Sequence, residues 1–156
     1  LDSNGNLYIQ GGTIMAFGTS SPECGIDANE EEGYSVIFTG GTLLAVGGGN
    51  STPSTSESTQ PYVSGSMSVT ADTEVALKSG DTVLAKFTVP SNYTSGNGGQ
   101  GGGPGGGGPG GWGGGGSSVL ITCPGLTSGS SYTMTSGTSS STVTATTGGN
   151  SGGRPW

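Results

Sequence analysis

The residues best suited to chemistry in this sequence are two carboxylates, each followed by an amide. Asp2 and Asn4 recur as Asp27 and Asn29, 25 positions further along the chain. If the two copies stack one strand apart, roughly 4.8 Å, the carboxylates repel each other unless a cation or a proton lies between them. Calcium accepts about six to eight oxygens, and the Asn side chains with backbone carbonyls can complete that set. The pattern predicts a calcium site; the alternative is that these are turn residues whose side chains bond their own backbone.

The rest of the sequence carries no arrangement typical of catalysis. It has no histidine, no nucleophile beside a base, and only three basic residues, Lys78, Lys86 and Arg154. The net charge of −7 provides no basic surface that would neutralise phosphates, so we expect no nucleic-acid partner. We therefore expect a protein that is not an enzyme.

A sequence echo organises the first third of the chain and would position the carboxylates. Residues 7–18 recur as residues 36–47, an offset of 29. This offset is four residues longer than that of the Asp/Asn pairs, and the acidic loop 30–33 accounts for the difference. Apolar residues alternate and β-branched types are frequent, which predicts strands, with each Gly-Gly pair at a corner. Self-similarity at this period is typical of solenoids. We therefore expect an all-β fold in which residues 1–49 form two coils of a right-handed parallel β-helix.

The outward positions of these coils are apolar, although a wall that faced water would be polar. Either the C-terminal half folds back over them as a lid, or another chain packs there. About three repeats are needed for a stable solenoid, and the sequence begins within a repeat, without a Met or a signal peptide. We expect the missing coils to come from a removed N-terminal part, another chain or a neighbouring copy. The predicted assembly surface consists of Tyr8, Met15, Phe17, Ile37, Leu44, Val46 and, from a later segment, Trp112.

The remainder of the chain divides by composition. Residues 50–66 are predicted to be a Ser/Thr/Pro linker, residues 67–147 a small antiparallel β cap over the open end of the solenoid, and residues 148–156 a tail. The strands expected in the cap cover residues 67–70, 74–78, 82–89, 119–123, 131–136 and 142–146.

A glycine tract, residues 96–116, interrupts the cap. Glycine occupies 16 of its 21 positions, and the tract lacks the Lys and Ser/Thr that would complete a phosphate-binding loop. Two interpretations stay open. The tract is a flexible loop, or it forms polyproline II-like strands that pack against one another with Trp112 as an anchor.

Composition also indicates the compartment. A chain with only 8% charged residues, rich in Ser, Thr and Gly, resembles extracellular β-proteins, and no apolar run approaches the length of a membrane span. Cys24 and Cys123 are a candidate disulfide under oxidising conditions, the alternative being two separately buried thiols. Asn50 and Asn92 each begin a glycosylation sequon.

Three stretches, residues 1–13, 25–28 and 119–134, resemble a bacterial family. These are the calcium-binding, acidic-polysaccharide-binding β-helix proteins of pectate-lyase-like shape, called carbohydrate-binding domain-containing proteins. The resemblance implies a secreted, non-catalytic protein with calcium on the coils, and Asp2 and Asp27 are the matching positions. Most of the β-helix of that family has no counterpart in this sequence. The glycine tract of this sequence has no counterpart in the family.

Two non-enzymatic functions follow. The first is an extracellular structural subunit that assembles with other copies of itself into a filament or surface matrix, through its open coil edge and glycine tract. The second is a calcium-dependent module that binds an acidic polysaccharide such as pectin or polygalacturonate. The mid-repeat start and the apolar outer wall favour the structural subunit, whereas the family resemblance favours the binding module.

Overall fold

The computed structural model describes residues 1–18, 23–94 and 117–147. Within these ranges the chain is all-β, with one 3-10 turn, η1 (Glu30–Glu32), in the acidic loop. The strands are β1 (Asp2–Ser3), β2 (Leu7–Phe17), β3 (Asp27–Ala28), β4 (Val36–Gly47), β5 (Tyr62–Met67), β6 (Glu74–Ser79), β7 (Thr82–Thr88), β8 (Ser117–Thr122), β9 (Ser131–Ser136) and β10 (Ser139–Thr144).

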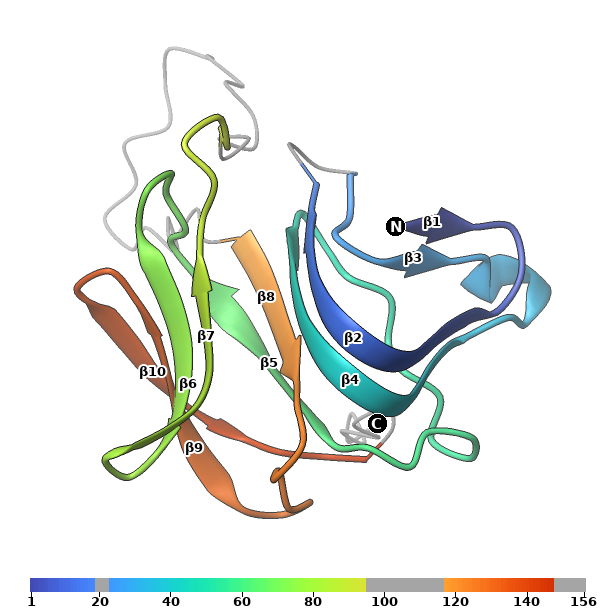
Figure 1. Cartoon of the computed structure of the whole chain (residues 1–156). Helices are drawn as coiled ribbons and strands as arrows, with labels where there is room; N and C mark the ends of the chain where they lie inside the picture. Colours follow the sequence, from blue (N-terminus) through green and yellow to red (C-terminus); the bar gives the residue numbers. More distant parts are fainter. Residues whose placement is uncertain (19–22, 95–116, 148–156) are drawn as a thin grey trace, which may run out of the picture.

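These strands form three layers (Figure 1). The central layer is a mixed sheet in the order β2-β4-β8-β5, in which only β2 and β4 run parallel. An antiparallel sheet in the order β10-β9-β6-β7 packs on one face of it, and the short parallel pair β1-β3 lies on the other side. The molecule is thus a two-sheet sandwich with a smaller third layer.

The prediction of a right-handed parallel β-helix is wrong, although the two repeats pair in the expected register. Asp2 pairs with Asp27 and Ile14 with Leu43, at the offsets that the echo indicated. The other edge of β4, however, is occupied by β8, which runs antiparallel. The chain therefore leaves the repeat pattern after two copies, and the sheets are mixed and antiparallel rather than solenoidal.

Strand β4 is buried on both faces, because a hydrophobic core lies on each side of it. Leu43 and Ala45 point into the core beneath β1 and β3, together with Ile26. Leu44 and Val46 point into the larger core of the sandwich. The apolar outer wall expected at these positions is therefore covered by the C-terminal half, the first of the two alternatives considered above.

Residues 50–61, expected to be a linker, instead pack along the second repeat. The Oγ atoms of Ser51 and Ser58 accept hydrogen bonds from the backbone N–H groups of Ala28 (3.0 Å) and Phe38 (3.1 Å). Both serines are buried. Their hydroxyls stand in for the carbonyls of a further strand, which is why this segment needs no apolar residue. The predicted linker also overlaps β5, which begins at Tyr62.

The side chain of Asn50 ties three segments together. Its Oδ1 accepts hydrogen bonds from the backbone N–H groups of Gly25 (2.9 Å) and Ile26 (3.2 Å). Its Nδ2 donates to the carbonyls of Ala45 (3.3 Å) and Ser118 (3.2 Å). One amide thus fixes the turn before β3 against the end of β4 and the start of β8.

The second half of the chain forms five of the six strands that the alternation predicted, but not the predicted cap. The strand expected over residues 67–70 is absent, and only Met67 of that range belongs to β5. β6, β7 and β9 occupy the expected ranges to within one residue, and β10 begins earlier. β8 joins the central sheet, and the remaining strands cover a face of that sheet rather than the end of a solenoid. The glycine tract and the tail lie outside the described residues. Nowhere in the described ranges does a helix have the length and apolar character needed to cross a membrane.

The hydrogen bonds of Asn50 give a stability prediction. Asn50→Ala leaves partly buried backbone groups without partners, and we expect the free energy of unfolding to fall by about 2–4 kcal/mol. Asn92→Ala is the matched control, because Asn92 also begins a sequon but is exposed, and its cost should stay below about 0.5 kcal/mol. Urea unfolding of both variants measures the difference. Equal losses would contradict the role assigned to Asn50.

Candidate functional site

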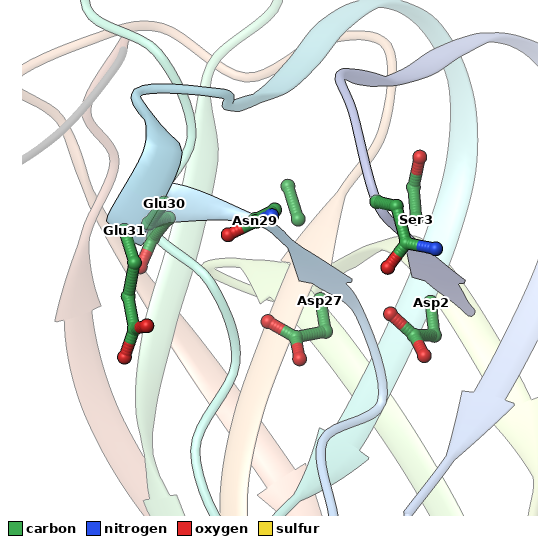
Figure 2. A pocket seen from close by; sticks show the side chains of 8 residues that line it. Asp2, Ser3, Asp27, Asn29, Glu30 and Glu31 are labelled. Atoms are coloured by element: carbon green, nitrogen blue, oxygen red, sulfur yellow. The ribbon is translucent and has the colours of Figure 1, made fainter.

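The predicted carboxylate pair is present, at the β1-β3 pair. Parallel pairing places Asp2 beside Asp27, and neighbouring side chains of paired strands lie on one face. Figure 2 shows the two carboxylates side by side and directed to the same side. They line an open pocket of about 420 Å³. The pocket is formed by Asp2, Ser3, Asn4, Asp27, Ala28, Asn29, Glu30 and Glu31.

The hydrogen bonds around this pocket differ from those of simple turn residues. Asp27 Oδ1 accepts a hydrogen bond from Ser51 Oγ at 2.9 Å, which reaches across from residues 50–61. Asn29 precedes η1 but makes no capping hydrogen bond with its side chain. In the first repeat it is Ser3 that forms the turn, since its Oγ accepts from the N–H of Gly5 (3.2 Å). For Asp27 and Asn29, the contacts therefore do not match the alternative in which the side chains bond the backbone of their own turns.

Sequence reasoning missed two carboxylates of this pocket. Glu30 and Glu31, interpreted as part of a solvated loop, line it because η1 begins immediately after Asn29. Glu30 Oε1 accepts a hydrogen bond from the backbone N–H of Thr52 at 2.8 Å, which anchors the loop. Their position directly after the second copy of the Asp/Asn motif was the signal that could have identified them.

The pocket offers oxygen ligands but no crowded metal centre. Asp2 and Asp27 are both exposed. Within the described ranges, no group of three or more His, Cys, Asp or Glu side chains is gathered closely enough to hold a metal ion. A cation here would thus be held by at most a carboxylate pair and neutral oxygens, and water would complete its coordination.

A second candidate site is the outer edge of β2. This strand ends the order β2-β4-β8-β5 and has no second neighbour among the described strands. Two of its apolar side chains are strongly exposed, Tyr8 at 52% and Met15 at 45%. Residues 7–17 contain no charged residue and no proline, so two of the common protections of an edge strand are missing from β2.

Four of the other residues predicted for the assembly surface are buried or half-buried in the fold. Ile37, Leu44 and Val46 are buried. Phe17 is half-buried and packs against Tyr93, with ring centroids 4.9 Å apart. Trp112 lies outside the described residues. The candidate surface therefore contracts to β2.

The two cysteines are not bonded to each other. Cys24 lies beside Gly47, since a Cβ built on Gly47 would be 2.9 Å from the Cys24 backbone. Gly47 in turn pairs with Ser118 of β8. Cys123 follows Ser118 by five residues, about 16 Å along an extended strand, whereas a disulfide requires Cα atoms within about 7 Å. Burial raises the pKa of both thiols, and the charge of Asp27 raises that of Cys24 further.

The two sequons differ in their surroundings. Nδ2 of Asn50, the atom that would carry a glycan, donates hydrogen bonds to Ala45 and Ser118. The fold therefore uses Asn50 as a structural residue. Asn92 is exposed, and its glycosylation stays a prediction.

Comparison with known proteins found no match for this chain, whether among protein-family models, curated proteins or solved structures.

Proposed function

We propose that this chain is a non-catalytic extracellular structural protein whose copies associate through the outer edge of β2, as one of the contacts that build a filament or surface matrix. The observation that supports it is a long edge strand that is uncharged, partly apolar and without a second neighbour in the described part of the chain. Unpaired N–H and C=O groups on such an edge are a template for a strand of another molecule.

The other sheet edges contrast with β2. β7 bears Lys86, which forms an exposed ion pair with Glu74 at 3.6 Å, and a charge on an edge opposes pairing. At β5, Tyr62 exchanges two hydrogen bonds of 2.9 Å with Thr146, so part of that edge is occupied. β10 is built mainly of Ser and Thr. Among these edges, β2 combines exposed apolar side chains with the absence of charge.

A charge on this edge tests the proposal. Tyr8→Lys should shift self-association to at least about tenfold higher concentration, since a buried ammonium and lost apolar contact cost on the order of 1.4 kcal/mol or more. Sedimentation velocity over a concentration series measures the shift.

The matched control is Val83→Lys on β7, because Val83 is apolar and 48% exposed, close to the value for Tyr8. It should leave association unchanged. Association that is equally weakened by both substitutions, or a wild-type protein that stays monomeric at high concentration, would contradict the proposal.

A second candidate function is calcium-dependent binding of an acidic polysaccharide, favoured by the side-by-side carboxylates of Asp2 and Asp27. The protein has a net charge of −7 and no Lys or Arg before Lys78. A polyanion could therefore approach this part of the molecule only through bridging cations. Calcium held by the carboxylate pair and by uronate groups of the polysaccharide would supply that bridge.

Thermal unfolding with and without calcium tests this candidate. A calcium concentration 100 times the dissociation constant stabilises by about 2.7 kcal/mol, so the unfolding temperature of the wild type should rise by several degrees. Asp2→Asn should abolish the rise, whereas Glu57→Gln, at an exposed carboxylate outside the pocket, should retain it. The same shift in both variants would rule out a site at Asp2.

A further inference from the structure

The sequence of β2 complements itself when a second copy runs antiparallel to it. We propose that two molecules join through their β2 strands in a two-fold symmetric contact, with Tyr8 opposite Met15 of the partner subunit. This inference rests on the proposed self-association and adds its geometry. In this register Ile9 also faces Ile14 of the partner subunit, and Gln10 faces Thr13 of the partner subunit. Apolar thus meets apolar, and polar meets polar.

The side chains lie on the matching faces for this register. Directly opposed residues of an antiparallel pair share a face of the sheet. The irregularity between Gln10 and Thr13, where Gly12 has a φ of 80°, shifts the alternation by one residue. Consequently Ile9 and Ala16 both point into the core beneath β1 and β3, while Tyr8 and Met15 are both exposed. A regular strand with these residues would have placed Tyr8 and Met15 on opposite faces.

The backbone groups also have the required phase. The N–H of Leu7 donates to the carbonyl of Ser35 (3.0 Å), and the N–H of Gly18 donates to that of Val46 (2.7 Å). Because successive residues of a strand turn their N–H and C=O groups to alternate edges, Tyr8 and Met15 turn theirs away from β4. An antiparallel hydrogen-bonded pair needs both residues to face the shared edge, and this condition is met.

The bend of β2 is compatible with two-fold symmetry. Gly11 and Gly12 lie at the middle of β2, which Figure 1 shows as a curved strand. A two-fold axis along the local sheet normal places each arm of β2 beside the opposite arm of its copy and keeps the concave faces on the same side. At this bend it is the pairing of β2 with β4 that is irregular, between Gln10 and Thr13.

This contact is isologous and therefore closes on itself as a dimer. The dimer is the building unit of the proposed assembly, and growth beyond it needs a different surface. Both four-stranded central sheets become one continuous sheet across the symmetry axis.

Cysteine pairing tests the register. Tyr8→Cys and Met15→Cys are prepared separately, mixed in equal amounts and oxidised at neutral pH. Opposed residues of a hydrogen-bonded pair are about 5.5 Å apart, within disulfide range, whereas two copies of Tyr8 would be about 23 Å apart. We expect the mixture to give at least about tenfold more disulfide-linked dimer than either variant alone. The wild type is the blank, because it carries the chain's own two thiols, Cys24 and Cys123, and neither introduced cysteine.

Sedimentation of each variant before oxidation separates the possible failures. Association without a Tyr8–Met15 link, or a strong link in Tyr8→Cys alone as parallel pairing requires, would overturn the two-fold register and leave the proposed function standing. Monomeric wild-type protein would overturn both. If Tyr8→Cys itself associates poorly, Gln10→Cys mixed with Thr13→Cys probes the same register. Absence of that link in an associating mixture would also overturn it.

Discussion

The parallel pairing of β2 with β4 is the constraint on which the rest of the structure depends. It aligns Ile14 with Leu43, and with β1 and β3 it aligns Asp2 with Asp27. β4 then becomes the one strand that faces both cores, with alternate side chains in each. Both the carboxylate pocket at β1 and β3 and the position of β2 at the edge of the described sheet follow from this register.

Only 28% of this chain is apolar, and hydroxyl groups compensate for the thin core. Ser51 and Ser58 satisfy N–H groups of the second repeat, and Thr122 Oγ1 donates to the carbonyl of Pro61 at 2.8 Å. Among the described residues, no buried side-chain nitrogen or oxygen lacks a partner. Side-chain hydroxyls thus bond the backbone on the β4 side of the repeats. On the β2 side, no described strand pairs with the outer edge. This asymmetry is the physical basis of the proposed assembly.

The local sequence pattern predicted most of the strands and the register of the two repeats. It predicted much less of how the strands are arranged in layers. The echo gave the register of Asp2 and Asp27 because side chains of aligned copies must stack. Alternation located β6, β7 and β9 to within one residue. Alternation also showed that Leu44 and Val46 point away from Leu43. It could not show which part of the chain covers the face to which they point. That cover comes from strands far along the chain, such as β9, which local periodicity cannot assign to a layer.

The candidate sites show the same division. Asp2 and Asp27 were found from spacing, whereas Glu30 and Glu31 were missed because the direction of η1 depends on Thr52, which anchors Glu30 from another segment. Asn50 matched a sequon by its three-residue pattern, yet its contacts with Ile26 and Ser118 bridge segments distant in the sequence. The disulfide was predicted from composition alone. It does not form because the direction of β8 carries Cys123 away from Cys24.

The central claim is that the edge of β2 is open in the single molecule and closed by another. Amide hydrogen exchange measured by NMR at low and high protein concentration tests it most directly. The account predicts that the amides of Tyr8 and Met15 exchange rapidly in dilute solution and become strongly protected at high concentration. The amides of Ile9 and Ala16, which face β4, should be protected in both. Protection of Tyr8 and Met15 that does not change with concentration, while the protein demonstrably associates, would contradict the account.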